Sequence, residues 1–150
     1  DLKAKIEKIK SVGFLIKLDT NGTNPEILKD LIDSNLLDYV AMDIKNAPSK
    51  YDVTTNSKVN LENIKKSISI LMENKVDYEF RTTLVNEFHD NNSIKEMGEL
   101  IKGAKRLYLQ KFVEREGCII HGLHEIEEET AKEFIEILKS HVKKVELRGY

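Results

Sequence analysis

The stretch Tyr39-Val40-Ala41-Met42-Asp43-Ile44-Lys45 decides the fold, because a short apolar run there changes to charged residues. Short runs rich in branched and aromatic residues are typical of buried β-strands. Apolar residues at helical spacing precede the stretch at 25–32 and follow it at 61–72. The pattern therefore predicts a strand between two helices, which is the repeating unit of a parallel α/β sheet.

The same alternation extends along the whole chain. Further strands are predicted at 14–18, 78–84, 106–109 and 145–147, with one helix before the first strand and one between each pair of successive strands. Three helix starts carry capping residues: Asn24-Pro25-Glu26, Asn60, and Ser93 with Glu96 as a capping box. The fold class is thus α/β with five mainly parallel strands. An open doubly wound sheet and an arc of a (β/α) barrel both fit this order.

Composition limits the function classes. The chain has 150 residues, a net charge of −2 and 33% charged residues, which predicts one domain over 1–150 with no general attraction for nucleic acid or membranes. No stretch approaches the roughly 20 apolar residues that span a bilayer. A single cysteine, Cys118, allows no internal disulfide and no cysteine-only metal site. We expect a cytoplasmic protein, and we expect the start at Asp1, close to a helix, to be a cut end.

Four of the five predicted strands change from apolar to polar or charged residues towards their C-terminal ends. These residues are Asp19-Thr20-Asn21-Gly22 after the first strand, Asp43 and Lys45 after the second, Arg81 and Thr83 within the third, and Gln110-Lys111 after the fourth. The C-terminal ends of parallel strands meet at one rim, where barrel enzymes place their catalytic groups. Carboxylates, an ammonium and a guanidinium at one rim should pair with each other or hold a zwitterionic ligand.

Simpler interpretations remain open for several residues. Asn21-Gly22 is also a common turn, and Lys45 taken alone could be a solvated side chain. His89-Asp90 fits a turn or cap better than an acid–base pair. A metal site at His121 and His124 near Cys118 lacks an acidic partner at a diagnostic spacing, and Cys118 fits a buried thiol better than a nucleophile.

The strand ends resemble those of radical S-adenosylmethionine enzymes. The similarity lies in Leu18-Asp19-Thr20-Asn21-Gly22, Asp38-Tyr39-Val40-Ala41-Met42-Asp43-Ile44-Lys45, Phe80-Arg81-Thr82-Thr83 and Tyr108-Leu109-Gln110. The chain is most similar to activating enzymes of glycyl radical enzymes, of the anaerobic ribonucleotide reductase and pyruvate formate-lyase types. Val85-Asn86-Glu87-Phe88 departs from the V-P-G that many activating enzymes have after the third strand.

The resemblance implies a partial (β/α)₆ TIM barrel, of which this chain is the C-terminal part. The family's C-x-x-x-C-x-x-C motif for a [4Fe–4S] cluster and its G-G-E-P segment are absent from the sequence. By resemblance, Asp19, Thr20, Asn21 and Asp43 line the cofactor rim, with a monovalent cation as a further ligand. Lys45 and Arg81 would then meet the methionine carboxylate or the ribose of S-adenosylmethionine.

The implied activity belongs to the full-length protein. It is reductive cleavage of S-adenosylmethionine to a 5′-deoxyadenosyl radical, which takes hydrogen from a glycine of a partner glycyl radical enzyme. A flavodoxin or ferredoxin-type protein would supply the electron, and this chain alone would be inactive. Two other hypotheses are an aldolase-type barrel lyase that uses Lys45 as a Schiff base and a non-catalytic α/β module that binds a cofactor or partner. Borohydride trapping would distinguish the lyase.

Overall fold

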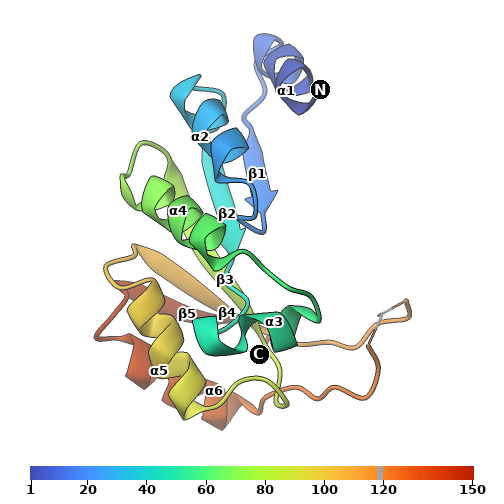
Figure 1. Ribbon diagram of the computed structural model, residues 1–150, viewed down its shortest axis with the longest axis vertical. Coiled ribbons are helices and arrows are strands. Elements are labelled where there is room, and N and C mark those ends of the chain that lie inside the picture. The colour runs from blue at the N-terminus through green and yellow to red at the C-terminus, as the bar shows by residue number, and fades with distance from the viewer. Residues whose placement is uncertain (118–119) are drawn as a thin grey trace. The chain divides into compact units, whose positions relative to one another are not determined.

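Helices and strands alternate in the computed structural model, which describes residues 1–117 and 120–150 (Figure 1). Their bounds are α1 Leu2–Ser11, β1 Lys17–Thr20, α2 Pro25–Asp33, β2 Tyr39–Asp43, a 3₁₀ turn η1 Pro48–Lys50, α3 Tyr51–Thr55, α4 Leu61–Met72, β3 Asp77–Leu84, α5 Asn91–Leu100, β4 Arg106–Lys111, α6 Glu128–Leu138 and β5 Lys144–Arg148. The chain divides into two compact units. Unit 1 comprises Asp1–Asp43 and Asn60–Glu79, and unit 2 comprises Ile44–Val59 and Phe80–Tyr150.

Unit 1 is built on the parallel pair β1 and β2, in which Leu18 lies opposite Val40 and Thr20 opposite Met42. Helices α2 and α4 pack against each other, and Figure 1 shows both on the same side of this pair. The core of the unit contains Leu28, Leu31, Val40, Met42, Ile64 and Leu71. The strand–helix alternation expected for these segments is therefore confirmed.

Unit 2 contains strand β3 from Phe80 onwards and the strands β4 and β5, all parallel, with Phe80 opposite Leu107 and Leu107 opposite Val145. Helices α5 and α6 pack against each other, and α6 also packs on β5. Fully buried side chains on β3 and β4 alternate with polar ones, as expected for strands with one face in the core. Phe80, Leu84, Leu107, Leu109, Met97 and Phe134 form much of that core.

The strand order β1-β2-β3-β4-β5 follows the chain without a reversal. A doubly wound sheet changes direction at a switch point, whereas a (β/α) barrel adds each strand beside the one before it. The order therefore favours the barrel arc over the open sheet that the sequence left possible, and the predicted α/β fold is confirmed. No helix in the described ranges 1–117 and 120–150 is long and apolar enough to cross a membrane.

Two of the three predicted caps are confirmed and the third is wrong. The Asn24 side chain accepts a hydrogen bond from the Ile27 N–H at 3.2 Å, and Asn60 begins α4 in the same way. Helix α5, however, begins after Asp90, whose carboxylate accepts from the Ser93 N–H at 2.8 Å. The capping box therefore pairs Asp90 with Ser93 rather than Ser93 with Glu96, and His89-Asp90 is the start of a helix as expected.

Two further differences concern the start of the first predicted strand and an element that was not predicted. The first strand begins at Lys17 instead of Phe14, and Phe14 and Leu15 are 65% and 84% exposed. An extra element, η1 with α3, follows β2 where no helix was expected. Its five-residue helix Tyr51–Thr55 is too short for a periodic apolar pattern to reveal.

Replacement of Gly22 by alanine is expected to lower the free energy of unfolding by about 2–3 kcal/mol, as measured by urea denaturation. Gly22 has φ = +76°, and an added Cβ would collide with the fully buried Met42 side chain. Gly13→Ala is the matched control, because Gly13 also has positive φ but has nothing within 4 Å. If the two variants lose equal free energy of unfolding, the close packing of Gly22 on Met42 is not the cause of the loss.

Candidate functional site

In unit 1 the predicted site residues lie at the C-terminal ends of β1 and β2. Asp19 is opposite Ala41 in the parallel register, so Asp19 and Asp43 are diagonal neighbours on one face of the pair. Asp43 is half-buried, and the exposed Asp19 carboxylate lies 3.6 Å from the Lys17 Nζ. Two nearby carboxylates on one face favour a cation or an ammonium group between them.

Thr20 and Asn21 build the turn after β1. The Thr20 hydroxyl accepts from the Gly22 N–H at 3.0 Å, and the Asn21 side-chain oxygen accepts from the N–H and hydroxyl of Thr23 at 3.0 and 2.7 Å. The Ser67 hydroxyl on α4 donates to the Gly22 carbonyl at 2.8 Å. By register Thr20 shares the face of Met42, opposite to the face of Asp19. The turn therefore shapes the strand end, and a ligand role for Thr20 or Asn21 stays a prediction.

In unit 2 the backbone of the segment that carries Lys45 is held next to β3. The Ile44 N–H donates to the Arg81 carbonyl at 2.8 Å, and the Thr82 hydroxyl donates to the Ile44 carbonyl at 2.7 Å. The structure thus brings the Lys45 segment and Arg81 together within one unit. Both side chains are half-buried. Their contact with a ligand stays a prediction.

Arg81 belongs to a polar face of strands β3 to β5. On this face Arg81 lies opposite Tyr108, and Gln110 lies opposite Thr83 on one side and Arg148 on the other. The Arg148 guanidinium stacks on the Tyr108 ring at 3.5 Å from its centroid, a cation–π contact. The alternate residues Leu107 and Leu109 are fully buried. This face therefore combines two guanidinium groups and an aromatic ring with the Glu146 carboxylate, which lies opposite Tyr108, and the mixture suits a polar ligand.

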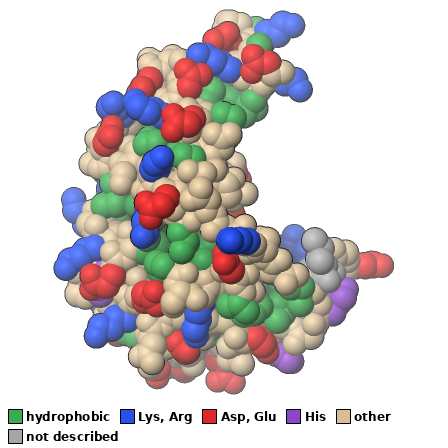
Figure 2. All heavy atoms as spheres, in the orientation of Figure 1, with side chains coloured by type: hydrophobic (Ala, Val, Ile, Leu, Met, Phe, Trp, Pro, Cys, Tyr) green, Lys and Arg blue, Asp and Glu red, His purple; other side chains and the backbone are tan. Residues whose placement is uncertain are grey.

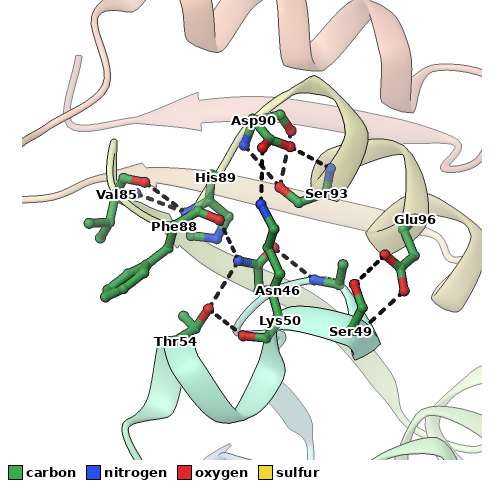
Figure 3. A network of polar contacts seen from close by, with 11 residues as sticks. Asn46, Ser49, Lys50, Thr54, Val85, Phe88, His89, Asp90, Ser93 and Glu96 are labelled. Atoms are coloured by element: carbon green, nitrogen blue, oxygen red, sulfur yellow. Dashed lines mark hydrogen bonds and ion pairs between the residues drawn. The ribbon is translucent and has the colours of Figure 1, made fainter.

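A network of polar contacts begins at Asn46, directly after Lys45, and reaches His89 and Asp90 in the loop before α5 (Figure 3). The fully buried Asn46 amide donates to the Phe88 carbonyl at 2.7 Å and to the Thr54 hydroxyl at 3.0 Å, and its oxygen accepts from the Ala47 N–H at 2.7 Å. Across the same network the Ser49 hydroxyl donates to Glu96 at 2.7 Å. The network connects η1 and α3 to the loop before α5 and to α5 itself.

His89 is the buried titratable member of this network, with only 4% of its surface exposed. Its Nε2 lies 2.9 Å from the Lys45 carbonyl, and its Nδ1 lies 3.0 Å from the Val85 N–H. Burial lowers the pKa of His89 below its ordinary value of 6.5, while hydrogen bonds to the Lys45 and Val85 backbone act in the opposite direction. The ring is therefore neutral at pH 7, and it is a structural group rather than the acid–base pair considered for His89-Asp90.

The remaining histidine candidates form separate pairs with glutamates. His124 Nδ1 lies 2.7 Å from a Glu87 carboxylate oxygen, and His121 Nδ1 lies 3.3 Å from Glu114. The hydrogen bond to Glu87 raises the pKa of His124. Within residues 1–117 and 120–150, no cluster of three or more His, Cys, Asp or Glu side chains is arranged to hold a metal ion. Cys118 lies outside the described residues, so its predicted burial is untested.

The pKa values of His89 and His124 are expected to be shifted in opposite directions from 6.5, as measured in a pH series of ¹H–¹³C spectra. The pKa of His89 should lie below 6.5 because of burial, with Lys50 lowering it further and Asp90 raising it, and that of His124 should lie above 6.5. Because the unfolded chain binds a proton at His89 before the folded chain does, the stability that neutral His89 provides is present above pH 6.5. It is lost as pH falls towards the folded pKa. A pKa for His89 above 6.5 would contradict the burial described above.

Sequence reasoning missed the residues that support the site. Tyr51, Asn46 and Thr82 bond to the backbone around Lys45 but have no motif of their own. The hydroxyl of the buried Tyr51 accepts from the Lys45 N–H at 3.2 Å. The D-x-K strand end itself was the one signal in the sequence. The backbone groups of Lys45 lie beyond the strand ladder, so they need hydrogen-bond partners from other parts of the chain.

Charges elsewhere on the surface are mixed. In the view of Figure 2, Lys and Arg side chains alternate with Asp and Glu, in keeping with the net charge of −2. Surface pairs such as Lys3–Asp30 and Lys139–Glu136 account for part of this mixture. No broad basic surface of the kind that binds nucleic acid is visible on that face.

The comparisons with known proteins point to one class. A protein of Methanocaldococcus jannaschii that carries the provisional name of glycyl-radical enzyme activating enzyme is 36% identical over 107 residues, which are 69% of this chain and 45% of that protein. The chain thus spans about half the length of this curated relative. No protein-family model matches.

A solved structure has the same fold. It is described as a domain of pyruvate-formate lyase-activating enzyme from Bacteroides vulgatus, and it covers 99% of this chain and 89% of its own length with a TM-score of 0.76 at 20% identity. The chain is therefore similar in sequence to a protein named for the activation of a glycyl-radical enzyme and similar in fold to a domain of a pyruvate-formate lyase-activating enzyme, in keeping with the resemblance of the strand ends.

Proposed function

We propose that this chain supplies part of the S-adenosylmethionine site of an enzyme that activates a glycyl radical enzyme. The observation that carries the proposal is the placement of charged side chains at successive C-terminal strand ends in a chain related to such an activating enzyme. Asp19 and Asp43 suit the ammonium group of the cofactor or a monovalent cation, and Lys45 and Arg81 suit its carboxylate or ribose.

The cofactor fits the chemistry of these donors, whereas a cluster does not fit the described residues. The full sequence has one cysteine, and no described group of side chains forms a metal ligand set over 1–117 and 120–150. The proposal therefore assigns the [4Fe–4S] cluster to none of these residues. When bound and reduced in the full-length protein, the cofactor supplies carbon–sulfur cleavage and hydrogen abstraction from a glycine of the partner.

The role of the chain's own residues is binding and orientation. The turn Thr20–Thr23 fixes the end of β1, and the network around Asn46 fixes the segment that follows β2. The glycyl radical enzyme is the proposed partner, a flavodoxin or ferredoxin-type protein is the proposed reductant, and the cytoplasm is the proposed location. Rigid strand ends suit this role because ligand groups must be held within about 0.5 Å.

The proposal predicts that the full-length gene product binds S-adenosylmethionine and that Asp43→Ala weakens this binding at least about fivefold, since it removes one carboxylate near the cationic end of the ligand. Isothermal titration calorimetry measures both. Asp30→Ala, at an exposed position on α2, is the matched control and should bind like the wild type. Wild-type affinity of Asp43→Ala would remove Asp43 from the site, and no binding by the wild type would contradict the proposed function.

A further inference from the structure

Both backbone polar groups of Lys45 are bound by buried side chains. The Lys45 N–H donates to the Tyr51 hydroxyl at 3.2 Å, and the Lys45 carbonyl lies 2.9 Å from His89 Nε2. Tyr51 and His89 are 2% and 4% exposed. Lys45 lies beyond the end of β2, where no strand ladder is assigned, so these side chains take the place of ladder partners.

The hydrogen bonds of His89 define its tautomer. The Lys45 carbonyl can only accept a hydrogen bond, so Nε2 carries the ring proton and donates to this carbonyl at 2.9 Å. Nδ1 of the neutral ring then accepts from the Val85 N–H at 3.0 Å, although the Val85 carbonyl also lies 3.2 Å from Nδ1. A neutral ring in this tautomer satisfies both contacts at once. The imidazole thus connects the end of β3 to the Lys45 peptide.

The loop that carries His89 is itself fixed. Asp90 caps α5 and pairs with Lys50 at 3.0 Å, and the Phe88 carbonyl accepts from Asn46 at 2.7 Å (Figure 3). The residues directly before and after His89 are therefore both held by hydrogen bonds or ion pairs. A donor held in this way can restrain the carbonyl that it bonds.

We propose that His89 is a positioning residue that sets the direction of the Lys45 side chain towards S-adenosylmethionine. This inference rests on the proposed function, in which Lys45 binds the cofactor. The two peptides that flank the Lys45 Cα together fix the position of that Cα and the direction of its Cα–Cβ bond, and the Lys45 carbonyl belongs to the second of them. Loss of the Nε2 donor releases this second peptide, so the Cα and its side chain can shift, while the Tyr51 hydroxyl still restrains the first peptide.

The test compares two replacements of His89 in the full-length gene product. His89→Phe keeps a ring but removes the donor, and it should raise the dissociation constant of S-adenosylmethionine about tenfold. His89→Gln places an amide N–H near the Nε2 position, so it should stay within about threefold of the wild type. His121→Gln, at an exposed histidine of the same unit, is the control and should bind like the wild type.

A double-mutant cycle with Lys45→Ala separates positioning from general structural damage. If His89 acts through Lys45, His89→Phe should have little further effect on binding once Lys45 is alanine. Tyr51→Phe removes the hydrogen-bond acceptor of the Lys45 N–H and should show the same coupling to Lys45→Ala. This variant replaces His89→Phe in the cycle if His89→Phe does not fold. Equal effects of the His89 and Tyr51 replacements with and without Lys45 would overturn the inference. Failure of the wild type to bind would instead contradict the proposed function.

Discussion

Lys45→Ala is expected to raise the dissociation constant of S-adenosylmethionine about ten- to a hundredfold in the full-length protein. A hydrogen bond that involves a charged group contributes about 1.5–3 kcal/mol, and each 1.4 kcal/mol is a factor of about ten in affinity. The Lys45 side chain is half-buried on a backbone held by Tyr51 and His89, so little ordering entropy is lost when the ligand binds.

Isothermal titration calorimetry of the variant checks this expectation. Lys58→Ala is the matched control, because Lys58 is an exposed lysine of the same unit and should not change the affinity. Lys45→Arg should bind with intermediate affinity, since it keeps the charge but changes the reach. Wild-type affinity of Lys45→Ala would exclude Lys45 from the cofactor site.

Asn46→Ala is expected to lower the free energy of unfolding by about 2–4 kcal/mol. Asn46 is fully buried, and its amide bonds the Phe88 carbonyl, the Thr54 hydroxyl and the Ala47 N–H. The variant leaves buried polar groups without partners, and each such group costs about 1–3 kcal/mol, offset in part by relaxation or entry of water.

Urea denaturation followed by circular dichroism measures this loss. Asn92→Ala is the matched control, because Asn92 is exposed in the first turn of α5 and should change stability by no more than about 0.5 kcal/mol. If Asn46→Ala loses less than about 1 kcal/mol, the network does not fix the segment that carries Lys45.

The strands could be predicted because branched, aromatic and other apolar residues gather, or alternate with polar ones, in short segments of strand length. The first strand was misplaced at its start, since Phe14 and Leu15 are apolar but exposed. Composition reports how apolar a residue is and does not report whether a neighbour covers it. The order of the strands within the sheet distinguishes a barrel arc from a doubly wound sheet. This order depends on strand pairing, which no local sequence pattern encodes.

The sequence predicted which side chains belong to the candidate site but not the contacts that hold them in place. The D-T-N-G and D-x-K strand ends were visible as motifs, but their supporting contacts come from far along the chain. His89 is 44 positions from Lys45, and Ser49 is 47 positions from Glu96. The capping box was assigned to Ser93 with Glu96 because both residue types fit that motif, whereas in the structure Glu96 bonds Ser49 and Asp90 caps the helix.

The most direct test of the proposed function is the formation of 5′-deoxyadenosine by the full-length gene product. The protein is reconstituted with iron and sulfide under anaerobic conditions, reduced with dithionite in the presence of S-adenosylmethionine, and analysed by liquid chromatography. We expect 5′-deoxyadenosine and methionine from the wild type, and at least about tenfold less at limiting cofactor from Lys45→Ala. An intact cluster with no 5′-deoxyadenosine from the wild type would contradict the account.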